Sequence, residues 1–357
     1  MKNKFSDYKV LDLFAGAGGF SLGFEQVGAT VVGAIEIDEW ATDTFRLNHP
    51  SSVVIKADIT KLSDEEVKRK FSGKNRPNII LGGPPCQGFS ICNKNSGDPK
   101  DPRNSLFTEF LRMGRLFQPE LLIMENVPNL IKAKTASKKM VVEIIAEEME
   151  SMGYYVYLEL MEAYRYGVPQ NRKRLVVLGS KKELLRPFPV ATHRLPNEKS
   201  SLPSCPTLWE AISDLPLVLP REGGEEMDYV SKPVNQFQKY SRGGAGNKVY
   251  NHLSMKHGKR MIERFASMEW GQSVSDVAEH FKPLARNGKG EISKTTYDQN
   301  NRRQHPNQIC NTVTASFYAN FVHPYQHRNF TAREAVSYTH LRAHETDSYL
   351  VCRLLLE

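Results

Sequence analysis

Only five cysteines occur in 357 residues, and no two of them form a Cys-x-x-Cys pair. A disulfide framework and a cysteine-based zinc site are therefore not expected, and we predict a reduced, cytoplasmic chain without a metal site. No run of eighteen apolar residues occurs either, so the sequence predicts neither a membrane span nor a secretory signal. The composition, 40% hydrophobic and 25% charged, is that of a globular protein and argues against a disordered or fibrous chain.

Positive charge is concentrated in one part of the chain. Residues 1–180 carry 24 basic and 22 acidic side chains, whereas residues 231–310 carry 14 basic and 6 acidic ones. A basic stretch beside a nearly neutral one suits a polyanionic partner, because each neutralised phosphate releases counterions. Charge alone fits a lysine-rich solvated surface equally well, so the motifs must decide.

Short apolar segments alternate with longer amphipathic ones through the first 180 residues. Strands are predicted at 9–16, 30–36, 52–58, 78–83, 120–126, 154–160 and 174–180. The clearest helical pattern covers 138–152, and Gly153 follows it as a stop signal. Six apolar side chains share one face of that helix: Met140, Val141, Ile144, Ile145, Met149 and Met152. Strands separated by helices predict an α/β fold with a doubly wound, mostly parallel sheet.

This alternation stops near residue 180. Seven of the 20 prolines fall between Pro187 and Pro220, and glycines cluster at 223–224 and 243–246. Such a composition indicates a linker that leads into a loop-rich region. We therefore predict a first domain over 1–180 and a second, smaller domain over 181–326.

A glycine-rich turn follows the first predicted strand. In DLFAGAGGF (12–20), Gly16, Gly18 and Gly19 let the backbone turn closely around a ligand at the start of a helix. The next two strands end in Glu36 and Asp58, placed to meet ribose hydroxyls and an adenine amino group. Each carboxylate alone could simply cap a helix. Together with the turn they favour a nucleoside ligand, and the G-x-G-G spacing disfavours NAD.

A single cysteine lies in the segment GGPPCQGFS (82–90). Cys86 follows the fourth strand and two prolines, so its thiol is expected in a stiff turn at the ligand-binding edge of the sheet. Its neighbours Gln87 and Ser90 are polar, which disfavours the packing role usual for a lone cysteine. We therefore predict a nucleophile.

Charged residues accompany two later strands. Glu125 directly follows the apolar run LLIM, where it could cap the next helix or act as a proton donor near the cysteine. In QNRKR (170–174), Gln170, Arg172 and Arg174 alternate and would share one face if the last strand starts early. Ordinary surface arginines are the alternative.

In order and spacing, these motifs resemble the DNA (cytosine-5)-methyltransferase family. The resemblance runs from residue 9 to 180 and resumes at 311–335. Its most specific part is the pairing of Pro85-Cys86-Gln87 with Glu125-Asn126-Val127. It implies an S-adenosylmethionine-dependent fold, with a catalytic domain at 1–180 and a target-recognition domain at 181–326. It also implies methyl transfer to carbon 5 of a cytosine flipped out of a specific double-stranded DNA sequence.

The resemblance also implies a role for each matching residue. Cys86 would bond to carbon 6 of the base, Glu125 would contact nitrogen 3, Arg174 would hold the base oxygen, and Arg172 would support the loop or a phosphate. The cofactor would contact Phe14, Ala15, Gly16, Gly18, Gly19, Glu36, Asp58, Ile59, Pro85 and Leu106. Expected DNA contacts are Gln87, Ser90, Arg242, Lys256, Lys259, Arg260, Arg302 and Arg303. Residues 91–105 would form a closing lid.

The sequence departs from the family pattern after residue 335. The family continues with a return segment containing Gly-Asn, whereas this chain reads SYTHLRAHETDSYLVCRLLLE (337–357). We expect 327–336 to begin a truncated return segment and 337–357 to be non-native.

This departure leaves a catalytically impaired DNA-binding homologue as one alternative. A tRNA cytosine methyltransferase is another, although Gln87-Gly88-Phe89-Ser90 fits the DNA enzymes better. A nicotinamide oxidoreductase is a third, disfavoured by the glycine spacing. We expect a stand-alone monomer of restriction–modification type, with an endonuclease acting on the same site as a partner.

Overall fold

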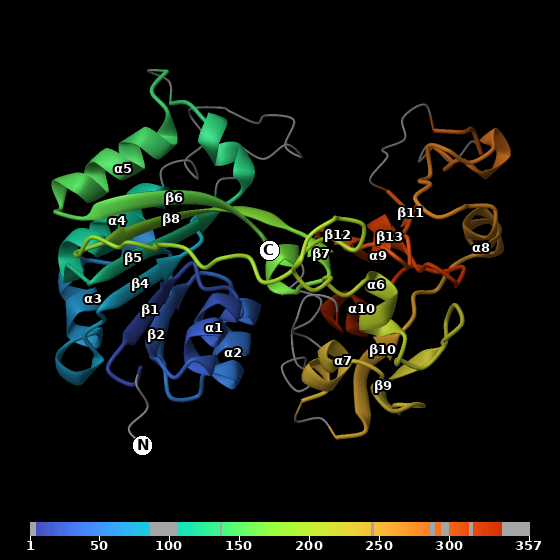
Figure 1. The fold of residues 1–357 in the computed structure, drawn as a ribbon, viewed down its shortest axis with the longest axis horizontal. Helices are drawn as coiled ribbons and strands as arrows, with labels where there is room; N and C mark the ends of the chain where they lie inside the picture. The colour runs from blue at the N-terminus through green and yellow to red at the C-terminus, as the bar shows by residue number, and fades with distance from the viewer. Residues whose placement is uncertain are drawn as a thin grey trace. The chain divides into compact units, whose positions relative to one another are not determined.

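The computed structural model describes residues 5–85, 106–135, 138–243, 246–285, 290–293, 300–313 and 317–337. The chain divides into two compact units, which Figure 1 shows as ribbons. Unit 1 comprises Met1–Met161 and Lys173–Val190, and unit 2 comprises Glu162–Arg172 and Ala191–Glu357. The chain therefore passes between the units three times. Among the described residues, no helix is both long enough and apolar enough to cross a membrane.

Unit 1 is built on one seven-stranded sheet. Its strands are β1 (Lys9–Leu13), β2 (Thr30–Glu36), β3 (Val53–Lys56), β4 (Ile79–Gly82), β5 (Leu121–Asn126), β6 (Tyr155–Glu162) and β8 (Lys173–Ser180). They lie in the order β3-β2-β1-β4-β5-β8-β6. Neighbouring strands from β3 to β5 are parallel, whereas β8 runs antiparallel to β5. The predicted doubly wound, mostly parallel sheet is confirmed.

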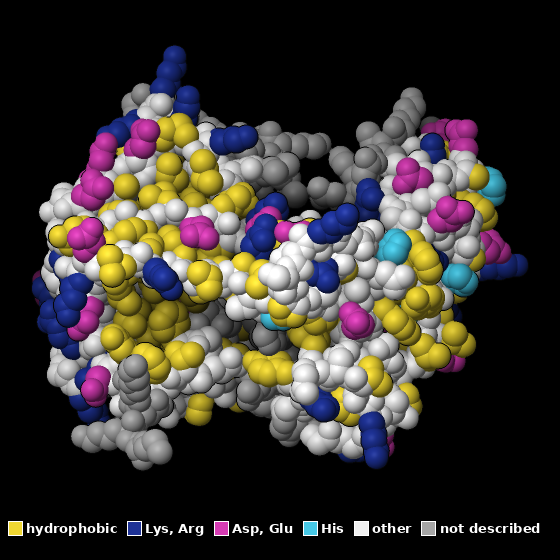
Figure 2. Space-filling view, viewed as in Figure 1, with side chains coloured by type: hydrophobic (Ala, Val, Ile, Leu, Met, Phe, Trp, Pro, Cys, Tyr) yellow, Lys and Arg dark blue, Asp and Glu magenta, His cyan; other side chains and the backbone are white. Residues whose placement is uncertain are grey.

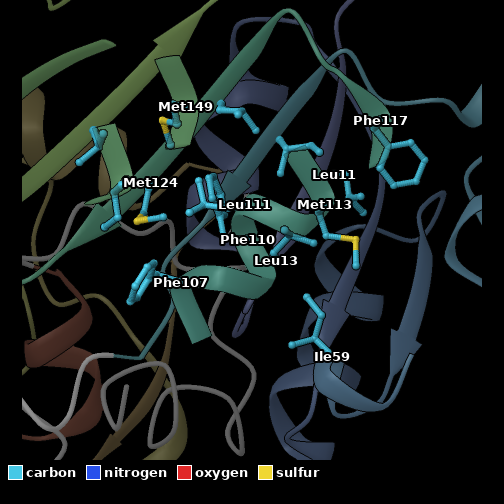
Figure 3. Packing of buried hydrophobic residues seen from close by; sticks show 14 of the residues in the cluster. Leu11, Leu13, Ile59, Phe107, Phe110, Leu111, Met113, Phe117, Met124 and Met149 are labelled. Atoms are coloured by element: carbon cyan, nitrogen blue, oxygen red, sulfur yellow. The ribbon is translucent and has the colours of Figure 1, made fainter. Parts of the chain in front are cut away.

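Helices supply apolar side chains to both faces of this sheet. They are α1 (Gly19–Gln26), α2 (Glu39–Asn48), α3 (Asp64–Lys70), α4 (Leu106–Phe117) and α5 (Val141–Ser151). Because side chains alternate along a strand, Leu11 and Leu13 join a core with α4 and α5, while Val10 joins a second core with α2. Figure 3 shows the first core, in which Phe110 of α4 lies close to Leu13. Burial on both faces explains the nearly continuous apolar strand sequences.

Two predicted elements differ from the observed ones at their ends. The first strand stops at Leu13 and not at residue 16, because Phe14 already has a φ of 57° and begins the glycine turn. The predicted helix over 138–152 forms as α5, with Met140 as its N-cap. Val141, Ile145 and Met149 are its buried side chains, as the pattern predicted.

Short 3₁₀ helices and one exposed strand complete unit 1. The helices are η1 (Ile59–Lys61), η2 (Gly73–Asn75) and η5 (Pro128–Lys132). The strand β6 ends the sheet order and exposes Tyr155, Leu158 and Leu160. Figure 2 shows hydrophobic side chains gathered over a broad part of the visible face of unit 1.

Unit 2 has shorter elements and more loop. Its helices are η6 (Ala163–Tyr166), α6 (Leu208–Ile212), α7 (Gln236–Ser241), α8 (Lys259–Ala266), η7 (Glu279–Phe281), α9 (Phe317–Asn320) and α10 (Ala332–Ser337). Its strands are β7 (Gln170–Asn171), β9 (Gly223–Asp228), β10 (Lys248–Leu253), β11 (Arg302–Arg303), β12 (Cys310–Asn311) and β13 (Phe321–Val322). They pair only two at a time, as β9–β10, β11–β13 and β7–β12.

The interior of unit 2 combines an apolar cluster with buried charges. Phe330 and Val336 pack with Leu208 and Val249 of α6 and β10. Beside them, Arg328 donates two hydrogen bonds to the carboxylate of Glu334, at 2.8 and 2.6 Å, and both side chains are buried. This unit therefore depends on polar contacts in its core to a greater degree than unit 1 does.

Candidate active site

The glycine turn is a tight, left-handed loop between β1 and α1. Phe14, Gly16 and Gly18 all have positive φ values, of 57°, 54° and 88°. A bulky residue such as phenylalanine rarely adopts this conformation, which costs on the order of 1–3 kcal/mol and is concentrated at functional sites. The amide of Phe14 donates to the carbonyl of Ile35 at 2.9 Å, which fastens the turn to β2.

Asn48 and His49, at the C-terminal end of α2, hydrogen-bond to the turn. Asn48 Nδ2 donates to the carbonyl of Ala17 at 3.0 Å, and Nε2 of His49 lies 3.1 Å from the carbonyl oxygen of Gly18. A Cβ atom at position 18 would lie only 2.4 Å from His49 Nε2. Glycine is therefore required there for space as well as for its φ. By contrast, a Cβ at Gly19 would meet nothing within 4 Å, so the turn is open at the start of α1.

A buried carboxyl group lies next to the turn. Ser21 Oγ of α1 donates a hydrogen bond of 2.7 Å to Oδ2 of Asp12, the penultimate residue of β1. This bond joins β1 to α1. Burial raises the pKa of Asp12 to about 7, although the hydrogen bond from Ser21 and the charge of His49 oppose that rise. Asp12 therefore connects β1 to α1, a role that the sequence motif did not indicate.

The two predicted nucleoside-binding carboxylates both make local hydrogen bonds. Oε1 of Glu36 accepts from the amides of Ile37 and Asp38, while Oε2 accepts from Gly16 at 2.9 Å. Asp58 caps η1 through Thr60, whose hydroxyl and amide both donate to Oδ1 and lower the pKa of Asp58. Oε2 of Glu36 retains a lone pair for a further hydrogen bond, and so does Oδ2 of Asp58, which lies 3.7 Å from Lys61 Nζ.

The remaining predicted cofactor residues differ in their exposure. Phe14, Ala15, Pro85 and Leu106 are half-buried, so their side chains retain accessible surface. Ile59 instead belongs to the apolar core with 4% of its surface exposed. Its side chain is therefore packed inside unit 1, and a cofactor contact of Ile59 stays a prediction.

Glu125 and Arg174 form an ion pair at the edge of the sheet. Arg174 Nε lies 2.7 Å from Glu125 Oε1, because β5 and β8 run antiparallel and bring the end of one beside the start of the other. Gly83 lies next to the second oxygen, since a Cβ there would be 3.4 Å from Glu125 Oε2. Asn126 Nδ2 donates to the carbonyl of Pro84 at 2.9 Å. The loop that leaves β4 is thus fastened beside the Glu125 carboxylate.

Several predicted residues lie outside the described part of the chain or in different elements. Cys86, Gln87, Ser90 and the predicted lid at 91–105 are outside the described residues, as are 338–357. The last strand of the sheet begins at Lys173, so Gln170, Arg172 and Arg174 do not form one strand face. Gln170 belongs to β7 and pairs with Cys310 of β12, and Arg172 lies in the connection between β7 and β8.

Two of the predicted DNA contacts are interior side chains. Arg242 pairs with Asp214 at 2.7 Å, donates to the carbonyl of Ser231 and lies over the ring of Tyr229. Arg303 is 4% exposed and donates to the carbonyls of His323, Pro324, Gln326 and Phe265. Because both guanidinium groups are buried among protein acceptors, we correct them to structural residues.

The other four predicted DNA contacts retain accessible surface. Lys256, Lys259 and Arg260 are exposed, and Arg302 is half-buried with a hydrogen bond to the carbonyl of Gly271. On the face drawn in Figure 2, Lys and Arg side chains are scattered among Asp and Glu. Among the described residues, no three His, Cys, Asp or Glu side chains cluster as a metal site would require.

Comparison with known proteins places these observations in one family. The chain matches the family model described as C-5 cytosine-specific DNA methylase over residues 8–341. It is 43% identical over 325 residues to the Type II methyltransferase M.DdeI of Desulfomicrobium norvegicum, which covers 91% of this chain and 76% of that protein. It is 31% identical over 325 residues to the Type II methyltransferase M1.HphI of Haemophilus parahaemolyticus, covering 91% and 75%. A solved E. coli prophage-encoded structure shares the fold, with a TM-score of 0.70, 24% identity and coverage of 97% and 98%.

Proposed function

We propose that this chain, which belongs to the C-5 cytosine-specific DNA methylase family, works through a covalent bond between Cys86 and its target base. Its family membership assigns it the transfer of a methyl group from S-adenosylmethionine to carbon 5 of cytosine in DNA. The observation that carries the proposal is the Glu125–Arg174 pair beside the tethered Pro84. Cys86 follows Pro84 by two residues.

The residues around the glycine turn fit S-adenosylmethionine. Gly19 leaves open space, Phe14 offers a half-buried aromatic ring, and Oε2 of Glu36 can accept a ribose hydroxyl. Asp58 would face the adenine amino group with Oδ2. Bound there, S-adenosylmethionine supplies an electrophilic methyl group. This chain contributes the fixed turn and the carboxylates that orient the donor.

The reaction itself needs a nucleophile, because carbon 5 of cytosine is a poor one. In our proposal the Cys86 thiolate bonds to carbon 6, and the displaced electron pair makes carbon 5 nucleophilic. Glu125 hydrogen-bonds nitrogen 3 of the base, and Arg174 orients that carboxylate and contacts the base oxygen. Carbon 5 takes the methyl group, with the sulfur of the donor as the leaving group, and then loses its proton to water. The electron pair of the broken C–H bond expels the Cys86 thiolate and restores the ring. The base must leave the helix to reach these groups.

Covalent trapping tests this proposal directly. In 5-fluorocytosine, fluorine replaces the carbon 5 proton and cannot be removed by a base. The adduct between such a duplex and Cys86 should therefore accumulate in the presence of S-adenosylmethionine. Cys86→Ala should abolish the adduct. Cys205→Ala is the matched control, because burial raises the pKa of Cys205 to about 12 and keeps that thiol unreactive. An adduct that survives in Cys86→Ala would show that another residue is the nucleophile.

We also propose that the chain is the modification enzyme of a restriction–modification pair. This rests on the Type II methyltransferase relatives, which span most of the chain. The cognate endonuclease would cut the same unmethylated sequence. Mapping methylated cytosines in host DNA with and without the gene should reveal one short motif that depends on it. Gene-dependent methylation scattered without a motif would contradict site-specific modification.

Neither the tRNA methyltransferase nor the protein that binds DNA without turnover is favoured. The matching family description names DNA, which argues against a tRNA substrate. The Glu125–Arg174 pair is in place, which argues against a protein that binds DNA without turnover. Methylation of tRNA without methylation of duplex DNA would reverse the first conclusion.

A further inference from the structure

The glycine turn rests on a buried histidine that the proposed reaction does not use. His49 is the C-cap of α2, and its ring lies against Phe45 with 4.4 Å between ring centroids. Nδ1 lies 2.8 Å from Glu25 Oε2 of α1, and Nε2 lies 3.1 Å from the carbonyl oxygen of Gly18. The ring thus connects the end of α2, the helix α1 and the turn itself. Only 1% of the His49 surface is exposed.

The chemistry of the two partners limits how the ring can be protonated. A peptide carbonyl can only accept a hydrogen bond, and an ionised carboxylate can only accept as well. A neutral imidazole has one donor and one acceptor nitrogen, so it would leave one of the two contacts without a proton. Both contacts are satisfied when both ring nitrogens donate, as an imidazolium paired with Glu25. The competing arrangement puts that proton on Glu25 and leaves Nδ1 as an acceptor.

Carboxyl groups lie near the ring on three elements. Glu25 approaches from α1, Asp12 from β1, and Glu36 lies near Asp12 at the end of β2. A positive His49 lowers the pKa of Asp12 against the effect of burial. Glu25 and the carbonyl of Gly18 are the groups in contact with the ring nitrogens, whereas Asp12, whose pKa burial raises to about 7, is largely protonated below that pH.

We propose that His49 is a positioning residue for the methyl donor: as an imidazolium it ties the Gly18 carbonyl to Glu25 and so holds the turn at Phe14–Gly19 in its binding conformation. The proposal rests on the donor site described above and adds the device that keeps it in shape. A hydrogen bond from a charged donor is stronger than a neutral one, so the tie resists opening of the turn.

Two substitutions separate the two contacts of the ring. In His49→Gln the amide nitrogen falls near the position of Nε2 and can still donate to the Gly18 carbonyl. In His49→Asn it falls near the position of Nδ1 and can reach only Glu25. The measurement is the dissociation constant of S-adenosylmethionine for the full chain by calorimetry, with DNA affinity and kcat at saturating donor measured alongside. Asp43→Asn on the exposed side of α2 is the matched control.

We expect His49→Asn to weaken donor binding about tenfold or more and His49→Gln by a few fold at most, because the hydrogen bond to the Gly18 carbonyl is lost only in the first. DNA affinity and kcat at saturating donor should change by less than about threefold. Equal weakening in both variants would indicate a packing role and overturn the proposal, as would an unchanged affinity in His49→Asn. A wild-type chain that binds no donor would overturn the donor site itself.

A spectroscopic measurement tests the protonation independently of whether these variants fold. Nitrogen-15 spectra of the histidine rings should show both nitrogens of His49 protonated in the wild type. In Glu25→Gln the side-chain amide can donate to Nδ1, so the ring should become neutral while Nε2 still donates to Gly18. Donor affinity should then fall by a few fold at most, because the contact with Gly18 remains but is no longer charge-assisted. A wild-type His49 with one unprotonated nitrogen would contradict the imidazolium.

Discussion

Units 1 and 2 satisfy their backbone groups in different ways. In unit 1, seven strands pair with one another, and apolar side chains cover the sheet on both faces. In unit 2, strands pair only in twos, and several are two residues long. Carbonyl groups there are met by buried arginines, as Arg303 meets those of His323, Pro324 and Gln326. The comparison shows that unit 2 satisfies backbone carbonyls with arginine side chains, whereas unit 1 satisfies them with hydrogen bonds between strands.

The two kinds of interior should respond differently to loss of one charge. Arg328→Met removes the partner of Glu334 and leaves a carboxylate buried. Burial alone would raise the pKa of Glu334, but the Arg328 charge outweighs burial and holds it below its usual range. We expect a loss of about 3–5 kcal/mol in the free energy of unfolding. Urea unfolding measures it.

The control for that substitution is an ion pair on the surface of unit 1. Arg46→Ala breaks the exposed contact with Asp43, so its effect should stay below about 1 kcal/mol. If Arg328→Met were as mild as Arg46→Ala, buried arginines would not be what holds unit 2 together.

A backbone substitution should be the most damaging local change in unit 1. Gly18→Ala places a Cβ 2.4 Å from His49 Nε2 at a φ of 88°. The left-handed conformation alone costs alanine about 1–2 kcal/mol, and the clash adds to it. We expect lower thermal stability and loss of S-adenosylmethionine binding. Gly19→Ala, where a Cβ meets nothing within 4 Å, should keep near-normal stability. Similar unfolding temperatures for the two variants would contradict the crowding beneath the turn.

Unit 1 should also show one pH-dependent weakness. The folded-state pKa of Asp12 is about 7, above its ordinary value of 3.8. The native state therefore holds a proton that the unfolded chain has lost, so stability falls as pH rises from about 4 to about 7. Asp12→Asn cannot ionise and should flatten this part of the profile. It should gain up to about 4 kcal/mol relative to wild type above pH 7, since one pKa unit corresponds to about 1.4 kcal/mol. Identical profiles for the two proteins would contradict the burial effect.

The smallest effects are expected from the exposed cations of unit 2. Lys256→Ala and Lys259→Ala should weaken DNA binding by a few fold and reduce the slope of log affinity against log salt by about one each. Fluorescence anisotropy over a salt series measures both quantities. Lys56→Ala, which breaks an exposed pair with Glu39 in unit 1, is a matched lysine control. A slope unchanged in the two unit 2 variants would place the DNA elsewhere.

The sequence predicted strands and helices well where buried side chains recur at a regular spacing. The seven strands of unit 1 and the buried face of α5 were predictable, because side chains that alternate or recur every three to four residues reveal which side is apolar. The end of β1 was predicted too late, since the left-handed φ of Phe14 arises from the turn and leaves no mark in hydropathy. The passage of Glu162–Arg172 into unit 2 likewise leaves no such mark.

The candidate site was only partly predictable for a related reason. Motif spacing indicated Glu125 and Arg174, which the structure brings together. Arg242 and Arg303 were read as DNA contacts, because nothing in a single sequence distinguishes a buried arginine from an exposed one. Asp12 and His49 were missed, and Asn126 was named only as part of a motif, since their roles depend on contacts with Ser21, Gly18 and Pro84.

The most direct test of the active site is the single-turnover rate of methyl transfer by Glu125→Gln. DNA and S-adenosylmethionine are both saturating in this measurement. Glutamine keeps the shape of the side chain but not its charge or its ion pair with Arg174. We expect the rate to fall by about a hundredfold or more, as when one preorganised electrostatic contact is removed, with both binding constants within about threefold of wild type. A wild-type rate, or a loss confined to donor binding, would contradict the role assigned to Glu125.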